Sequence, residues 1–504
     1  MVSTVIPLIG SGVQSQGVQL NPSQLINLYE TNSLGVDTAK SKKAIVRTPG
    51  TSLKYLVPNL GRYRGHIVWN NILYVVYTTE LYSITIGGVI TLLNSGTPVT
   101  SGSGRVSIVC NGLQILIEDG TTAWTYTISG GAFAEMTDAD YTHTGYVTFQ
   151  ATRGIYAKTT DNTIWASAIN DLTSWTATAF SSHESPPQPL VVAFATPIDL
   201  YTMGPVNTLV WANTNDVFFP WEPKQGVNIP YGCAARHSVV YTNGTIIWLS
   251  KNSQGKALLI GLSGYSPQIL LDEAATYQLQ QLTTISDAKG ATFELNGHIF
   301  YALTFPTEEV SFLYDTQTKK FIKWMSWKTE GTDVNGNSIY TLNRHLFDDI
   351  CEFNNETLIF DYRANGAILK LDTSTYTEYE AGASDSVYCE CISPNITANG
   401  MRITVNSMEL DHEKGMSIYS AEDIVQDPTL NIPLFSVSLS KDGGRTFNYS
   451  RDVNFGYSGD YTTRAKLNCW GDFRNGAVKI STDHPSFIGI YNIWADVEVE
   501  GATA

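Results

Sequence analysis

Between residues 60 and 375 the hydrophobic pattern repeats one unit: an alternating apolar segment, a small polar turn and a second strand rich in aromatic and β-branched residues. Alternation is typical of half-buried strands, and Asn-Gly between two strands is a strong hairpin signal because type I′ turns need positive φ. Seven turns are expected, at Asn70-Asn71, Asn111-Gly112, Asp161-Asn162, Gly204-Pro205, Asn243-Gly244, Asn296-Gly297 and Asn354-Asn355. Most copies continue into another strand pair, so each unit has about four strands.

A period of roughly 40–50 residues with four strands is the signature of propeller blades. The sequence therefore predicts an all-β protein with a β-propeller of six or seven blades. Six is favoured, with one copy assigned to a neighbouring sheet. A string of β-sandwiches is the alternative, because the spacing is irregular, but many consecutive hairpins favour radial closure, which leaves few exposed edges.

Two regions fall outside the repeat. Residues 1–55 are polar and rich in Gly and Asn, whereas residues 387–504 again show alternating strands, for example at 401–410 and 490–500. We predict an N-terminal segment (1–55) that packs with the C-terminal domain, a propeller (56–375), a polar linker (376–386) and a β-sandwich-like domain (387–504). The best helical pattern is at 271–282, and it predicts one short helix.

The composition changes the picture mainly through charge. The chain of 504 residues has 31 Lys and Arg against 47 Asp and Glu, a formal net charge of −16. Proteins that bind duplex DNA normally carry a basic face, because phosphate neutralisation supplies much of their affinity. An acidic protein can instead form the wall of a conduit, where repulsion prevents DNA from sticking. No signal peptide and no membrane-spanning run is recognised.

Motifs for catalysis or cofactor binding are absent from the sequence. The eight histidines are isolated, no Cys-x-x-Cys occurs, and Cys389-x-Cys391 has no further ligand nearby, so no metal site is expected. There is no Gly-x-Ser-x-Gly, and "GSGR" (102–105) is not followed by the residues of a phosphate loop. We therefore predict no enzyme activity and no cofactor. The paired carboxylates Asp348-Asp349 do not by themselves indicate a hydrolase.

One motif, "SKDGGRTF" (440–447), matches a turn that is familiar from sialidases and other propellers. Asp442 can accept hydrogen bonds from its own turn, Gly443 and Gly444 allow positive φ, Thr446 can bond across the turn and Phe447 can cover it. A sialidase would show several copies on its blades, whereas this one is solitary and outside the repeat. We interpret it as a structural turn. The alternative is a glycan-binding or glycan-cleaving propeller, whose many aromatic residues would stack on sugar.

Several stretches, in order along the chain, resemble the packaged-DNA stabilisation proteins, or tail nozzles, of short-tailed bacteriophages. They include "NPSQLINLYETNS" (21–33), "RTPGTSLKY" (47–55), residues 164–194, "LVWAN" (209–213), "SGYSPQIL" (263–270) and residues 438–480. The matching positions are Asn27, Tyr29, Pro49, Gly50, Trp165, Trp175, Glu184, Pro189, Trp211, Gly232, Gly264, Tyr265 and Pro267. Gln188 stands where the family has Asp, and Phe447 where it has Trp.

The resemblance implies a non-enzymatic ring of six identical chains in the virion tail, made in the cytoplasm of the bacterial host. Its partners would be the portal–adaptor proteins on one side and a tail needle or plug on the other, with tailspikes or fibres beside it. Double-stranded DNA would pass through the ring without specific binding. The resemblance carries over no catalytic residue.

Overall fold

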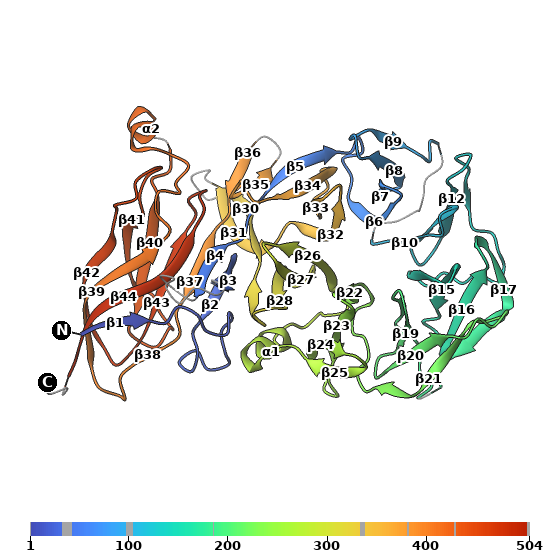
Figure 1. Cartoon of the computed structure of the whole chain (residues 1–504), viewed down its shortest axis with the longest axis horizontal. Helices are drawn as coiled ribbons and strands as arrows, with labels where there is room; N and C mark the ends of the chain where they lie inside the picture. The colour runs from blue at the N-terminus through green and yellow to red at the C-terminus, as the bar shows by residue number, and fades with distance from the viewer. Residues whose placement is uncertain are drawn as a thin grey trace.

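The computed structural model describes residues 2–32, 43–96, 104–184, 186–332, 338–380, 383–427 and 430–500. Nearly all of the regular secondary structure is β-strand. Radially arranged sheets make up one end of the molecule, and a second β domain built from both ends of the chain makes up the other (Figure 1). The two α-helices of the described segments are α1 (Glu273–Gln280), at the expected helical pattern, and α2 (Ala421–Gln426).

Seven antiparallel four-stranded blades can be followed in the described residues. Blades 1 to 4 are β6 (Tyr63–Trp69), β7 (Ile72–Tyr77), β8 (Glu80–Thr85), β9 (Ile90–Leu92); β10 (Ser107–Cys110), β11 (Gln114–Glu118), β12 (Ala123–Thr127), β13 (Phe133–Glu135); β14 (Val147–Gln150), β15 (Arg153–Ala157), β16 (Thr163–Ala168), β17 (Asp171–Ser182); and β18 (Val192–Ala195), β19 (Leu200–Met203), β20 (Thr208–Asn213), β21 (Trp221–Ile229).

Blades 5 to 7 complete the ring. They are β22 (Val240–Thr242), β23 (Thr245–Lys251), β24 (Ala257–Ser263), β25 (Ser266–Ile269); β26 (Lys289–Leu295), β27 (His298–Phe305), β28 (Val310–Asp315), β29 (Phe321–Lys323); and β32 (Phe347–Phe353), β33 (Glu356–Asp361), β34 (Ala367–Asp372), β5 (Gly50–Leu56). The last blade takes its fourth strand, β5, from the N-terminal region.

This closure gives seven blades, the larger of the two expected counts, and not the favoured count of six. β5 pairs antiparallel with β34, so a strand near residue 50 joins one near residue 370. A hydrophobic cluster fills the junction of blades 7 and 1, with Tyr55, Tyr63, Leu73 and Phe360 among its members. Clusters of the same kind lie between each other pair of neighbouring blades. The expected division at residue 55 therefore cuts through a propeller strand.

Five of the seven expected turns join the first and second strands of a blade, and both central residues have positive φ in four of them, those at Asn70, Asn243, Asn296 and Asn354. In the fifth turn only Gly112 has positive φ. The turns at Asp161-Asn162 and Gly204-Pro205 instead join the second and third strands of blades 3 and 4. The first turn of blade 3 is Ala151-Thr152, with φ of 49° and 66°. This offset, together with an inserted hairpin after blade 6 (residues 325–344), explains why the expected turns are irregularly spaced along the chain.

The second domain is a pair of packed sheets. One has the order β3 (Leu28–Asn32), β4 (Lys43–Arg47), β44 (Gly489–Val499), β39 (Ile403–His412), β42 (Ala465–Phe473), with β1 (Val2–Ile6) also on β44. The other has β2 (Gln24–Ile26), β37 (Cys389–Ile392), β43 (Asn475–Thr482), β40 (Leu434–Ser440) and β41 (Tyr449–Asn454), with β38 (Ile396–Thr397) on β43. Because β2 also pairs with β29, the second sheet continues into blade 6.

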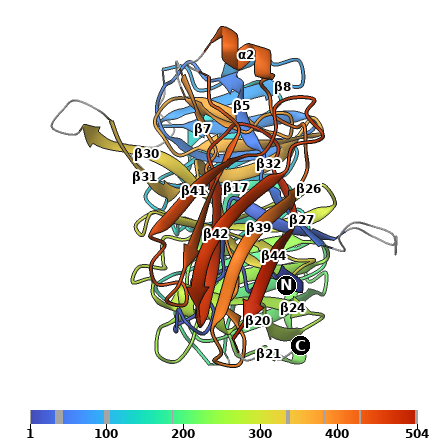
Figure 2. The ribbon, with the colours of Figure 1, turned by 90° about the vertical axis from the view of Figure 1, so that its left-hand side faces the viewer.

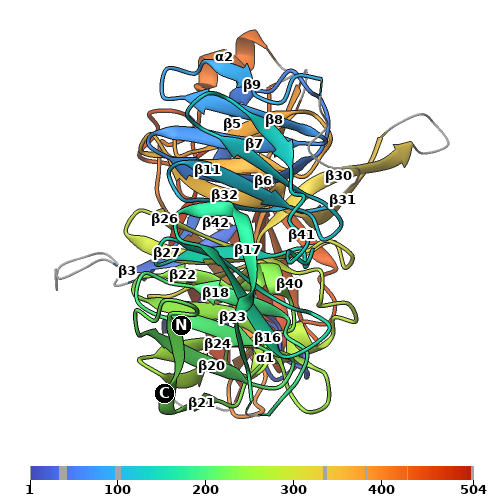
Figure 3. The same ribbon diagram turned by 90° about the vertical axis from the view of Figure 1, so that its right-hand side faces the viewer.

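Two further hairpins lie between the domains. β30 (Met325–Thr332) and β31 (Ser338–Arg344) are inserted between blades 6 and 7 and project from one side of the body, opposite to β3 and β4 (Figures 2 and 3). β35 (Thr377–Glu380) and β36 (Ala383–Ser386) occupy most of the expected linker, which is therefore a hairpin in its described residues. No helix of the described segments is long and apolar enough to cross a membrane.

Candidate functional site

Ionised side chains meet at the axis of the propeller, where the first strands of neighbouring blades lie against one another. Arg105, at the entry to blade 2, pairs with Asp349 of blade 7. The Tyr63 hydroxyl of blade 1 donates to Asp349 over 2.9 Å, and His66 Nδ1 lies 3.4 Å from the same carboxylate. Burial alone would raise the pKa of Asp349, but Arg105 and His66 hold it well below its usual range.

A second ion pair lies beside the first. Lys289 Nζ of blade 6 is 2.6 Å from both carboxylate oxygens of Asp348, and Arg344 approaches Asp348 at 3.7 Å. Burial lowers the pKa of Lys289. Burial also lowers the pKa of His237, at the entry to blade 5, and the positive charge of Arg105 adds to this effect. Five blades thus contribute titratable groups to one axial cluster.

The axial cluster connects the inner strands of neighbouring blades. Its members come from five consecutive blades (5, 6, 7, 1 and 2), and direct contacts of 2.6–3.4 Å join blade 6 to blade 7 and blade 7 to blade 1. Removing one partner from such a buried pair is costly because the other charge loses its compensation. The axial cluster therefore fixes the inner strands of blades 6, 7, 1 and 2 to one another.

A second polar centre joins the two domains at Asn27. This residue is fully buried, with φ of 54°, at the bend between β2 and β3. Its side-chain amide donates to the carbonyls of Met325 (2.8 Å) and Tyr388 (2.7 Å), and its oxygen accepts from the Met325 N–H (2.9 Å). One side chain thereby connects the N-terminal segment, the projecting hairpin and the start of the C-terminal domain.

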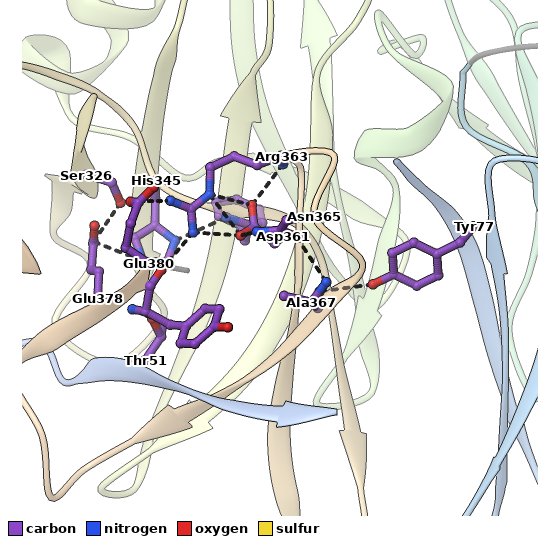
Figure 4. Close-up of polar contacts among 12 residues, drawn as sticks. Thr51, Tyr77, Ser326, His345, Asp361, Arg363, Asn365, Ala367, Glu378 and Glu380 are labelled. Carbon is purple, nitrogen blue, oxygen red and sulfur yellow. Dashed lines mark hydrogen bonds and ion pairs between the residues drawn. The ribbon is translucent and has the colours of Figure 1, made fainter. Parts of the chain in front are cut away.

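Figure 4 shows the neighbouring network between blade 7 and the β35–β36 hairpin. Arg363 forms a two-pronged pair with Asp361 at 2.7–3.1 Å and also contacts Glu380 at 2.8 Å. Glu378 is buried, accepts from the Ser326 hydroxyl over 2.6 Å and lies 3.9 Å from His345 Nε2. Burial raises the pKa of Glu378 to about 8, although Ser326 and Arg363 act in the opposite direction.

The Glu378→Gln variant should remove part of the pH dependence of stability. In the folded protein the pKa of Glu378 is raised from 4.5 to about 8. The stability that protonated Glu378 contributes is therefore fully present below pH 4.5 and is lost as pH rises toward 8. Glutamine retains the acceptor for Ser326 but does not titrate. Urea unfolding at several pH values should show the wild type losing stability relative to the variant between pH 5 and 8. Parallel curves would mean that Glu378 is ionised throughout.

The "SKDGGRTF" stretch connects β40 to β41 and holds its carboxylate tightly. Asp442 accepts hydrogen bonds from the N–H groups of Arg445 and Thr446 (3.0 Å each), from the Thr446 hydroxyl (2.6 Å) and from Ser440 (2.6 Å). Desolvation opposes these bonds, but together they lower the pKa of Asp442 well below its usual range. Gly443 and Gly444 have φ of 74° and 90°, and the ring of Phe447 lies 5.3 Å from Lys479 Nζ.

Because every oxygen of this carboxylate is engaged locally, the Asp442→Ala variant should lose roughly 1–2 kcal/mol of unfolding free energy, the value for several solvent-screened bonds to a charged acceptor. The lowered pKa means that this stabilisation is present above pH 4 and fades as pH falls further. Asp442→Asn, which retains an acceptor, should lose less. Thermal unfolding measures the effect. A fully stable alanine variant that loses a glycan-hydrolase activity would support the sialidase-like interpretation instead.

The tryptophans among the family positions lie in blades. Trp175 and Trp211 are buried, with ring N–H groups that donate to the Leu172 carbonyl (3.1 Å) and to the Thr202 hydroxyl (2.7 Å). Trp165 is partly exposed, stacked on Phe180 and covered by Lys158 Nζ at 4.4 Å. Tyr29, on β3, accepts a hydrogen bond from Asn296 of blade 6. These positions have packing roles in the structure, and they form no common sugar-binding platform.

The other family positions lie in turns or connections, or where two backbone segments pack closely together. They are Pro49 and Gly50, where β5 starts; Glu184 and Pro189, in an exposed connection beside Gln188, whose amide contacts Asn207; Gly232, packed against the backbone at Gly204; and Gly264, Tyr265 and Pro267, in the outer hairpin of blade 5. The Tyr265 hydroxyl donates to Asp199 of blade 4 over 2.8 Å. The structure therefore distributes the family positions over the molecule and does not gather them into one site.

Sequence reasoning missed the axial cluster and Glu378. The signal for the cluster was Asp348-Asp349 inside an apolar strand pattern, because adjacent carboxylates on a buried strand need cationic partners. Nothing in the local sequence marks Arg105 or Lys289 as those partners.

In the described part of the chain no group of three or more His, Cys, Asp or Glu side chains is placed to hold a metal ion. The six cysteines are not paired in disulfides.

These features define the chain as a seven-bladed β-propeller protein, closed by an N-terminal strand and joined to a second β domain. A family model described as "Bacteriophage P22 Gp10, beta-propeller" matches residues 5–376, well over half of the chain. The chain therefore belongs to this family of phage proteins, which stabilise packaged DNA. No curated protein matches.

Matches among solved structures include the N-terminal domain of Nup159 (9% identity, TM-score 0.37, 68% of this chain and 98% of that chain). YCF48 bound to D1 peptide has 9% identity and a TM-score of 0.39, covering 65% and 98%. A virginiamycin B lyase from Staphylococcus aureus has 9% identity and a TM-score of 0.36, covering 64% and 98%. Similarity at this level carries no argument about function.

Proposed function

We propose that this chain is a structural component of a bacteriophage tail, a nozzle ring below the portal and adaptor that closes the head, retains packaged DNA and forms the ejection channel. The observation that carries the proposal is the family match over residues 5–376. The engaged carboxylates of Asp349 and Asp442 support a role without catalysis.

We infer that DNA passes between copies of the chain. The ionised side chains at the axis of each propeller, joined by contacts as short as 2.6 Å, support this inference because they occupy space that DNA would need. Six copies would carry a formal charge of 6 × −16 = −96. A wall with this charge repels phosphates, so DNA slides without being held at any sequence. Heterologous contacts between copies would close such a ring.

In this proposal the portal–adaptor proteins bind one face of the ring. A needle or plug closes the other face, and tailspikes or fibres attach beside it. The protein would be made in the host cytoplasm and would end in the tail of the virion.

DNA retention tests the proposed function. Phage particles assembled without this chain should contain packaged heads that lose their DNA, and the added purified chain should restore nuclease-resistant DNA in a dose-dependent way. Unrelated tail proteins at the same concentration are the control. Heads that retain DNA fully without the chain would contradict the proposal.

A further inference from the structure

Four basic side chains lie at one mouth of the propeller axis, around which the first strands of the blades are arranged (Figure 1). Each stands at or just before the start of a first strand, with Arg105 before β10, Arg236 before β22, Lys289 at the start of β26 and Arg344 before β32. The first strands of a propeller all begin on the same face, so the four side chains meet there. The electrostatic effect of Arg105 and Arg344 on Lys289 agrees with this placement. We call these four residues the basic mouth.

The basic mouth carries more positive charge than its partners compensate. The ion pairs that its four cations form with described residues involve two carboxylates, Asp348 and Asp349, in a chain whose net charge is −16. Both carboxylates are buried, whereas Arg105, Arg236 and Lys289 are partly exposed. The layer of this cluster nearest to solvent is therefore cationic, and it attracts a negatively charged ligand.

The donor groups of the basic mouth exceed the acceptors that the protein offers them. In the described part of the chain Arg236 forms no ion pair, and its Nη1 donates to the Thr144 carbonyl over 2.6 Å. The buried Nη1 atom of Arg105 has no hydrogen-bond partner there, and neither has that of Arg344, which lies 3.7 Å from Asp348. A buried N–H without an acceptor is costly, so a ligand that supplies acceptor oxygens is favoured at this place.

The half-buried imidazole of His237 lies among these cations. Burial lowers its pKa, and the positive charges of Arg105, Arg236 and Lys289 lower it further, against an opposing effect of Asp349. Neither ring nitrogen forms a hydrogen bond to another described residue. A neutral imidazole has one N–H, so His237 offers a further donor beside the cations.

We propose that the basic mouth binds an inorganic oxyanion of the phosphate type, held by Arg105 and Arg236 beside His237. A guanidinium group presents its N–H donors in a planar fork, which suits an ion with several acceptor oxygens better than a halide. The ion offsets the excess positive charge and joins the entry of blade 5 to that of blade 2. The inference goes beyond the proposed function and concerns a single chain, so it does not depend on the ring.

Calorimetric titration of the purified full-length chain with inorganic phosphate tests the site, at an ionic strength held constant with sodium chloride. The wild type should bind phosphate, and Arg236→Gln should bind it roughly tenfold more weakly, because one charge-assisted hydrogen bond is lost. This variant leaves no carboxylate unpaired in the described residues. Arg474→Gln is the matched control, because Arg474 is exposed, its Nη1 also donates to a carbonyl, that of Gly400, and the change in net charge is the same. Its affinity for phosphate should equal that of the wild type, and thermal unfolding checks that each variant folds.

The imidazole of His237 gives a second readout that does not rely on affinity. Phosphate should shift its NMR signals with the same half-saturation as in calorimetry, and should raise its pKa, because the bound negative charge offsets the three cations. His484 in the C-terminal domain, with a pKa of about 4, is the control and should not respond. No phosphate binding by the wild type, equal binding by Arg236→Gln, or unchanged His237 signals at saturating phosphate would each overturn the inference. None of these results bears on DNA retention, which tests the proposed function separately.

Discussion

The Gly50→Ala variant is expected to destabilise the protein by about 3 kcal/mol or more, by opening the last blade of the propeller. A Cβ at this position would lie 2.2 Å from the carbonyl oxygen of Thr377 and 2.7 Å from its nitrogen. Both are backbone atoms, so neither can rotate away. Gly50 also begins β5, the strand that closes the ring, and its N–H donates to the Thr375 carbonyl over 2.8 Å.

A matched glycine separates this clash from the general effect of the substitution. Gly87 lies in an exposed turn of blade 1, where the nearest atom to a Cβ would be 3.8 Å away. Gly87→Ala should therefore be neutral or slightly stabilising. Urea unfolding gives the free energies, and hydrogen exchange of the β5 and β34 amides should accelerate selectively in Gly50→Ala. Equal stability of the two variants would mean that β5 does not close the ring as described.

The Asn27→Ala variant should also cost about 3 kcal/mol or more, and it should uncouple the two domains. The substitution removes the partner of the Met325 N–H and of the Met325 and Tyr388 carbonyls, which belong to half-buried residues, and each unsatisfied buried group costs about 1–3 kcal/mol. We expect the single unfolding transition of the wild type to separate into two transitions, one for the propeller and one for the C-terminal domain. Calorimetry measures this separation.

Two controls resolve the origin of the Asn27 effect. Asn27→Gly keeps the positive φ of 54° without strain but loses the hydrogen bonds, so it should remain almost as destabilised as Asn27→Ala. Asn399→Ala changes an exposed asparagine at φ of 48°, and it should cost only about 1 kcal/mol. If Asn27→Gly restored wild-type stability, the backbone conformation, and not the hydrogen bonds, would explain the position.

The sequence could predict blades because their signals are local. Asn-Gly turns and alternating strands identified the hairpins, and α1 matched its helical pattern. The turn at Ala151-Thr152 escaped notice because neither residue favours positive φ, so the fold imposes that conformation. The blade count was uncertain because β5 pairs with β34 across more than 300 residues, and no local pattern encodes a partner at that separation.

The candidate sites were less predictable. Asp442 could be interpreted from its own motif, because its partners lie within four residues. Asp349 and Arg105 are 244 positions apart in sequence, and only the radial arrangement of blades brings them together. Glu378 lies in a stretch with the composition of a linker, and its burial depends on two hairpins and blade 7. Side chains whose roles come from tertiary placement could not be recognised from composition or spacing.

The most direct test of this account is a three-dimensional reconstruction of the tail in DNA-filled virions, with the positions of this chain and of the DNA both resolved. The account predicts six copies in a closed ring, with DNA density running between the copies and none along the axis of any propeller. DNA density through a propeller axis, or a single isolated copy of the chain in the tail, would contradict it.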